Sequence, residues 1–369
     1  MRYLGNKTRL LPFILSKIDR LGLTPGVAHD AFAGTCAVGR ALKARGWRVA
    51  SSDVMTYSYV LQRAYVVAQR VPSFAELRAG DGDLRAALRS AKFRAAVAAR
   101  GGGALAAVAE YLSRWLEPEC GFITEHYAPG GGRMYFTEEN ARRIDAIRRR
   151  LHVWHTEGLI GDDAYYILLA ALIEGADRVA NTAGVYAAFI KQWQPNARHH
   201  LTLAPQLPIR GARGCTAHID DATETARTLG PIDLLYVDPP YNSRQYSGYY
   251  HVPEIIARGW FEARPAVAGK TGLLADGAQR SAWCSPRQVE GALEALLAAT
   301  GARHILISYN SEGLLSERVL RGALERAAVD GRVVRYAREY RRYRADSDHV
   351  GRTYRGGRLR ELLYYARLR

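Results

Sequence analysis

The residues of this chain best suited to chemistry follow directly on an apolar run. Residues 232–237 contain five apolar side chains and one Asp, and the sequence Asp-Pro-Pro-Tyr occupies 238–241. Consecutive prolines cannot continue a central strand, so the chain must leave its sheet there. The turn offers the Asp238 carboxylate, the Pro239 carbonyl and the ring face, rather than the hydroxyl, of Tyr241. These groups suit the binding of an exocyclic amino group while a planar base stacks on the tyrosine. A plain strand-ending turn is the alternative.

A second candidate site lies near the N-terminus, where a glycine turn follows the predicted strand at 27–32. Gly34 lets the backbone approach a ligand closely, and the predicted helix after it favours negative charge at its N-terminus. The next predicted strand, 47–52, ends at Asp53, where an acidic residue can bind ribose hydroxyls. The Gly-x-Gly-x-x-Gly dinucleotide pattern is incomplete because Cys36 stands at its second glycine. Ordinary turn residues are the alternative at both positions.

Two further segments carry polar groups in predicted loops. Tyr3, Gly5 and Lys7 lie close together in the sequence and can wrap a ligand that bears a carboxylate; an unremarkable chain terminus is the alternative. Asp221 follows the predicted strand at 215–219 and can accept a hydrogen bond from an adenine amino group. A cap on the following helix is an equal alternative for this aspartate.

Strand patterns flank a long helical block. From about residue 59 to 180, Ala-, Arg- and Leu-rich helical patterns replace them, while the composition of 262–286 predicts a loop. We predict an α/β fold, a Rossmann-like doubly wound sheet, with a helical domain inserted between its second and third strands. The sheet domain is predicted at 1–60 and 203–369, and the helical insert at 61–202. Later strands are predicted at 304–310, 332–337 and 362–366.

The composition indicates a globular protein with a polyanionic partner. The chain has 369 residues, of which 48% are hydrophobic, and a formal charge of +16. Residues 332–369 hold twelve Arg against four acidic residues, with tyrosines interleaved, which favours nucleic acid over a membrane surface. A solvated surface of an Arg-rich protein is the alternative. The arginines expected to contact phosphates are Arg341, Arg342 and Arg344.

Cysteine and histidine spacing indicates neither a disulfide framework nor a metal site. The four cysteines are far apart and form no Cys-x-x-Cys pair, and the ten histidines show no metal-ligand spacing. No apolar run approaches the length of a membrane span. We therefore expect a reduced, cytoplasmic, monomeric protein without metal or membrane partner.

Together these motifs resemble one family, the D12 class of DNA adenine-N6 methyltransferases, or Dam-like group. In chain order, the motifs that carry the resemblance lie at 3–7, 32–35, 53 and 238–241. It extends to 242–246 and 250–251, and more loosely to 308–310 and, within the insert, 181–191.

The resemblance implies S-adenosylmethionine as methyl donor and DNA as partner. The residues it assigns to the cofactor are Tyr3, Gly5, Lys7, Phe32, Gly34 and Asp53. Asp238 would lie between cofactor and target amine, and Lys191 and Arg244 would contact DNA. The family usually has Gly where this chain has Cys36, and we expect the cysteine to fit with a negative φ.

Other interpretations of the sequence stay open. A cytosine-N4 or RNA-adenine methyltransferase would keep nearly all of these residues, although Asp238 at the head of its motif is, by resemblance, the adenine form. A DNA-binding protein on a methyltransferase scaffold would keep the basic tail without needing Asp238 and Tyr241. An NAD-dependent oxidoreductase would need the glycine that Cys36 replaces.

Overall fold

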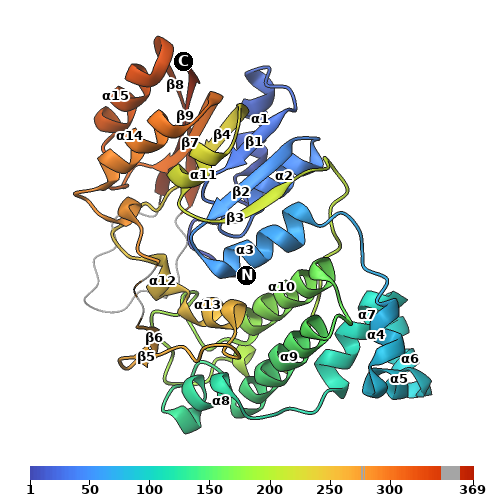
Figure 1. The fold of residues 1–369 in the computed structure, drawn as a ribbon. Coiled ribbons are helices and arrows are strands. Elements are labelled where there is room, and N and C mark those ends of the chain that lie inside the picture. The colour runs from blue at the N-terminus through green and yellow to red at the C-terminus, as the bar shows by residue number, and fades with distance from the viewer. Residues whose placement is uncertain (276, 278, 342–357) are drawn as a thin grey trace. The chain divides into compact units, whose positions relative to one another are not determined.

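The computed structural model describes residues 1–275, 277, 279–341 and 358–369, which form two compact units (Figure 1). The sheet unit comprises Gly5–Gln62, Arg210–Ser247 and Ala278–Arg369. The helical unit comprises Met1–Leu4, Arg63–Ile209 and Gly248–Gly277. Relative to the domain boundaries expected from the sequence, the helical unit also takes in 1–4, 203–209 and 248–277.

A seven-stranded sheet forms the centre of the sheet unit, in the order β3-β2-β1-β4-β7-β9-β8. The first five of these strands run parallel, and β9 lies antiparallel between β7 and β8. The predicted Rossmann-like doubly wound fold is therefore confirmed. The strands are β1 Val27–Asp30, β2 Arg48–Asp53, β3 Thr216–Ile219, β4 Ile232–Val237, β7 Ala302–Asn310, β8 Ala328–Arg341 and β9 Arg358–Leu368.

Helices cover the sheet because its central strands are apolar on both faces. Leu293 and Leu324, from α14 and α15, belong to one buried cluster with Ile305 and Ile307 of β7, and Figure 1 shows these two helices on the same side of the sheet. The α-helices of this unit are α1 Leu11–Arg20, α2 Ala37–Ala44, α3 Thr56–Gln62, α11 Ala222–Thr228, α14 Val289–Ala299 and α15 Glu317–Ala327; η5, Ala282–Cys284, is a 3₁₀ turn. A further helix, α12 Tyr246–Tyr249, contains the chain boundary between the units.

The topological switch point lies between β1 and β4. These strands pair in parallel, with Asp30 opposite Tyr236, and the Ala31 amide donates to the Tyr236 carbonyl at 3.0 Å. The turns that follow the two strands therefore leave the same edge of the sheet side by side, which is where ligands bind in such folds.

The helical unit is built around two long helices. Helix α9, Glu138–Thr156, begins where Thr137 Oγ1 accepts from the Asn140 amide at 3.3 Å, as its capping sequence predicts. Helix α10 spans Asp162–Val179. The other α-helices are α4 Ala75–Gly80, α5 Gly82–Arg89, α6 Ala91–Ala99, α7 Gly103–Glu110, α8 Phe122–Tyr127 and α13 His251–Arg258. Shorter helical turns are η1 Arg63–Val67, η2 Tyr111–Trp115, η3 Pro129–Gly131 and η4 Pro195–Arg198.

One element of the helical unit differs from the sequence prediction. The composition of 262–286 predicts a loop, but β5 Val267–Ala268 and β6 Leu273–Leu274 form an antiparallel hairpin within it. Strands of two residues are too short for an alternating pattern, so the sequence carries no strand signal there.

Arg148 of α9 is buried and satisfies the end of α13. Its side chain is 2% exposed, its Nε donates to the Ile256 carbonyl at 2.8 Å, and its Nη2 donates to the Ala257 carbonyl at 3.4 Å. The last carbonyls of a helix have no partner within it, so a buried guanidinium replaces the water that would otherwise bind them.

Replacing Arg148 by Ala should therefore lower the free energy of unfolding by about 3 kcal/mol, because buried carbonyls would lose a charged donor. The neighbouring Arg149 is a matched control, since it is 59% exposed and pairs with Glu119 at the surface. Arg149→Ala should change stability by less than about 1 kcal/mol. Urea denaturation followed by circular dichroism measures both variants, and equal losses would show that the contacts of Arg148 contribute nothing special.

Candidate active site

The turn after β4 places Asp238 beside a buried lysine. Lys7 is 4% exposed, and its Nζ lies 3.0 Å from Asp238 Oδ1 and 3.0 Å from Glu361 Oε1. The Tyr241 hydroxyl donates to Asp238 Oδ1 at 2.5 Å and accepts from Lys7 Nζ at 2.6 Å. One ammonium, one hydroxyl and two carboxylates thus form a single network, which we call the Lys7 network.

Three separate parts of the chain hold this network. Lys7 lies just before α1, and its carbonyl accepts from the Leu10 and Leu11 amides, which fixes its backbone. Tyr241 packs edge-on against Tyr309 of β7, with ring centroids 5.2 Å apart. Glu361 comes from β9, the antiparallel strand beside β7.

Burial and the neighbouring charges set the protonation of the Lys7 network. The pKa of Asp238 is raised to about 6, mainly by burial. The charge of Glu361 also raises this pKa, whereas Lys7 and the hydrogen bond from Tyr241 lower it. For Lys7, burial opposes the charged form, yet the Asp238 and Glu361 carboxylates outweigh it and raise the pKa. Asp238 is therefore ionised above about pH 6 and takes up a proton below it.

The glycine turn after β1 is fixed by acidic side chains. Asp53 Oδ2 accepts from the Gly34 amide at 2.9 Å, and its Oδ1 accepts from the Met55 amide at 3.0 Å. Asp30, which is buried, accepts from the Gly39 amide at 2.9 Å. Burial raises the pKa of Asp30 to about 7, and the charges of Asp238 and Asp53 add to the shift. The turn therefore has a rigid backbone with acidic groups on it.

Cys36 corrects one expectation, because its φ is 60° and not negative. It precedes α2 in the left-handed conformation that glycine adopts most easily, and its side chain is fully buried. Such a conformation costs a non-glycine residue about 1 kcal/mol or more. The turn thus keeps the backbone shape of a glycine turn although it has a cysteine in that position.

The remaining cofactor candidates lie in different places. Phe32 is half-buried against Trp283, with ring centroids 5.0 Å apart, and forms an apolar wall. Asp221 caps α11, since its Oδ1 accepts from the Thr223 amide at 2.8 Å; a role toward adenine stays a prediction. Tyr3 belongs to the helical unit, where it stacks on Tyr250 at 4.8 Å. Gly5 belongs to the sheet unit and has a φ of 81°.

The residues expected to bind DNA are spread along the chain. Lys191 and Arg244 are exposed. The loop before Lys191 is shaped by Asn181, whose Nδ2 donates to the Ile190 carbonyl at 2.7 Å. Arg341 ends β8, and Arg342 and Arg344 lie outside the described residues.

Sequence reasoning missed three polar residues of this region. Asp30 ends β1 two residues before Phe32, a position where an acid could have been noticed. Ser308 lies in the stretch 308–310 that resembles the family loosely, but no role was assigned to it. Glu361 is buried within a strand and gave no local signal, because its contacts depend on how β7 and β9 pair. The Tyr241 hydroxyl was also missed, since only its ring face was predicted to function.

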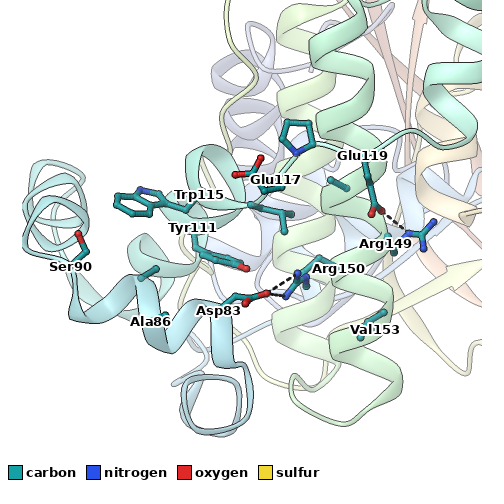
Figure 2. A pocket seen from close by; sticks show the side chains of 14 residues that line it. Asp83, Ala86, Ser90, Tyr111, Trp115, Glu117, Glu119, Arg149, Arg150 and Val153 are labelled. Atoms are coloured by element: carbon teal, nitrogen blue, oxygen red, sulfur yellow. Dashed lines mark hydrogen bonds and ion pairs between the residues drawn. The ribbon is translucent and has the colours of Figure 1, made fainter.

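A separate cleft of about 780 Å³ lies in the helical unit, and Figure 2 shows the side chains that line it. Its two arginines are paired: Arg149 lies 2.6 Å from Glu119, and Arg150 lies 3.3 Å from Asp83 (Figure 2). All its lining residues come from the helical unit, whereas the Lys7 network belongs to the sheet unit.

In the part of the chain that the structure describes, no group of three or more His, Cys, Asp or Glu residues could hold a metal ion. None of the helices there is both long enough and apolar enough to cross a membrane.

A sheet of this order, with a glycine turn and an acidic Pro-Pro-Tyr turn at its switch point, has the architecture of a Rossmann-like methyltransferase. A family profile described as D12 class N6 adenine-specific DNA methyltransferase matches residues 3–273. The chain belongs to this family. It is an adenine-specific DNA methyltransferase, with DNA as its substrate and a methyl donor as its second substrate.

Three relatives illustrate the similarity. The Type II methyltransferase M.NlaIII of Neisseria lactamica is 36% identical over 94% of this chain and 93% of its own length. The Type II methyltransferase M.CviAII of Paramecium bursaria Chlorella virus 1 is 30% identical over 95% and 94%. The Type II methyltransferase M.FokI of Planomicrobium okeanokoites is 33% identical over 94% of this chain, which spans about half (50%) of that longer protein.

The Tyr241 hydroxyl predicts a shift in pH dependence. Because it donates to Asp238, it stabilises the ionised carboxylate, and its removal should raise the pKa of Asp238 above about 6. In Tyr241→Phe, the acid limb of the kcat profile, the low-pH range in which kcat rises as Asp238 loses its proton, should therefore move to higher pH. Tyr309→Phe is the control, since that hydroxyl accepts from the Leu315 amide instead. The measurement is the methylation rate between about pH 5 and about pH 9 for the wild type and both variants. Acid limbs at the same pH in all three proteins would contradict the prediction.

Proposed function

We propose that this chain is the modification enzyme of a restriction–modification system and transfers a methyl group from S-adenosylmethionine to adenine N6 at a specific DNA sequence. The names of the similar proteins, which include Type II methyltransferases and the modification methylase StsI, support this role. The observation that carries the mechanism is the pairing of β1 with β4, because it sets the Gly34 turn beside the Asp238 turn.

The residues of the glycine turn fit S-adenosylmethionine. The Asp53 carboxylate is half-exposed at the end of β2, where it can accept hydrogen bonds from ribose hydroxyls. Phe32 offers an apolar wall to an adenine ring, and the φ of 49° at Gly34 brings the backbone close. The resemblance assigns the carboxylate-bearing end to Tyr3, Gly5 and Lys7, but the Lys7 ammonium already pairs with Asp238 and Glu361, so we propose for Lys7 a role within the Lys7 network instead. When bound, S-adenosylmethionine supplies an electrophilic methyl group on a positively charged sulfur.

The Asp-Pro-Pro-Tyr turn would hold the target base. The adenine must leave the duplex, which costs a few kcal/mol, and stacking on Tyr241 offsets part of this cost. Asp238 and the Pro239 carbonyl accept the two N6 hydrogens, so the nitrogen lone pair turns out of conjugation with the ring.

In the transfer step, the N6 lone pair forms the new nitrogen–carbon bond while the carbon–sulfur bond breaks. The extra proton on N6 passes to Asp238 or to water. No covalent enzyme intermediate is needed, so most of the rate would come from positioning, which is worth up to about 7–11 kcal/mol in favourable cases. An ionised Asp238 is the better acceptor, which matches its ionisation above about pH 6.

DNA binding would involve both units of a monomeric enzyme. Exposed Lys191 and Arg244, with Arg341, Arg342 and Arg344, would contact phosphates, and the helical unit would serve as the target-recognition domain. Phosphate contacts set affinity, whereas sequence is read at base edges, so the basic residues would not choose the recognition site.

The proposal predicts that Asp238→Ala lowers kcat by at least about a thousandfold while DNA affinity changes little, because its partner is one amine of one base. Asp53→Ala should instead weaken the binding of S-adenosylmethionine, measured by calorimetry, because ribose hydrogen bonds are lost. Methylated DNA digested to nucleosides should yield N6-methyladenine by mass spectrometry. Nearly full activity in Asp238→Ala would contradict the mechanism, and N4-methylcytosine as the main product would contradict the base assignment.

A further inference from the structure

Glu361 is a buried carboxylate on β9 that contacts the Lys7 network from a different strand than the one before Asp238. Glu361 is 8% exposed, and one oxygen, Oε1, accepts from Ser308 Oγ at 2.7 Å. The same oxygen lies 3.2 Å from the Tyr241 hydroxyl, whose one proton is donated to Asp238. The same oxygen lies 3.0 Å from Lys7 Nζ. Glu361 lies outside residues 3–273, the part of the chain that matches the family profile.

A buried carboxylate is costly unless donors surround it, and here one oxygen meets two of them, the Ser308 hydroxyl and the Lys7 ammonium. Ser308 is 1% exposed and comes from the neighbouring strand, so it fixes the position of Glu361. Lys7 thus pairs with two carboxylates, which a simple surface ion pair would not provide. Besides Ser308, Glu361 lies next to Lys7 and Tyr241, and both of these groups also contact Asp238.

We propose that Glu361 is a positioning residue for methyl transfer, because its carboxylate holds the Lys7 ammonium, which in turn contacts Asp238 and the Tyr241 hydroxyl. Without it, Lys7 would pair with Asp238 alone and compete with the target amine for its oxygens. This inference rests on the proposed role of Asp238 as the group that holds the target amine. It adds to the site a side chain from the far end of the chain.

The charge of Glu361 also bears on when Asp238 is ionised. The titratable groups that face this cluster are Lys7 before α1, Asp30 at the end of β1, Tyr236 on β4 and Tyr241 after β4. Among the causes that set the pKa of Asp238 near 6, Glu361 is a like charge that raises it. Removing the charge of Glu361 removes this repulsion and leaves the attraction of Lys7 for the Asp238 carboxylate, so the pKa of Asp238 should fall.

The test is the pH profile of kcat, at saturating DNA and methyl donor, for Glu361→Gln and Glu361→Asp in the full-length protein. In Glu361→Gln, the acid limb should move down by about half a pH unit or more, opposite to the shift expected for Tyr241→Phe, and kcat at neutral pH should fall about tenfold. In Glu361→Asp, which keeps the charge, the limb should stay near that of the wild type. Glu294→Gln, which removes an exposed partner of Arg326, is the matched control and should change neither quantity.

An acid limb that does not move in Glu361→Gln would overturn the inference and leave Glu361 a purely structural role. The inference is also overturned if Glu361→Gln fails to fold, by thermal melting, while Glu361→Asp has wild-type kcat. Asp238→Asn separates this result from failure of the proposed function. If that variant keeps wild-type kcat, the mechanism itself fails; if it is inactive while the Glu361→Gln limb is unmoved, only the inference about Glu361 fails.

Discussion

The candidate active site depends on one buried ammonium group between two carboxylates. Lys7 Nζ lies 3.0 Å from both Asp238 and Glu361, and almost none of the lysine is exposed. Either carboxylate alone would be expensive to bury as an anion in this position, and the two together would repel each other. The lysine lowers the pKa of Asp238, so this carboxylate can be an anion in the position that we propose for the target amine.

The topology of the sheet explains how these groups come together. Lys7 precedes the first helix, Asp238 follows β4, and Glu361 comes from β9, close to the end of the chain. The pairing of β7 with β4 on one side and β9 on the other carries the two carboxylates to neighbouring positions. The same arrangement sets the Asp238 turn beside the glycine turn after β1. A change in any of these strand pairings would separate the groups, although each could still form its local turn.

Local sequence was sufficient for the fold class and for the turns, because both depend on short-range patterns. The apolar run of β4 and its prolines predicted the turn at Asp238, and the acid at the end of β2 made Asp53 a candidate. Glu361 could not be found in this way, since its function arises only from the pairing of distant strands. The bond between the Tyr241 hydroxyl and Asp238 was missed for the same reason, and the φ of 60° at Cys36 shows that the surrounding turn outweighed the preference of the residue.

The most direct test of this account is the pH dependence of kcat in Lys7→Gln, with Lys7→Arg as the variant that keeps the positive charge. Removing the ammonium should raise the pKa of Asp238 above about 6, so the acid limb should move upward and activity at neutral pH should fall sharply but recover in part at higher pH. Lys7→Arg should keep the limb close to that of the wild type. An acid limb in Lys7→Gln at the same pH as in the wild type would contradict the claim that Lys7 keeps Asp238 ionised.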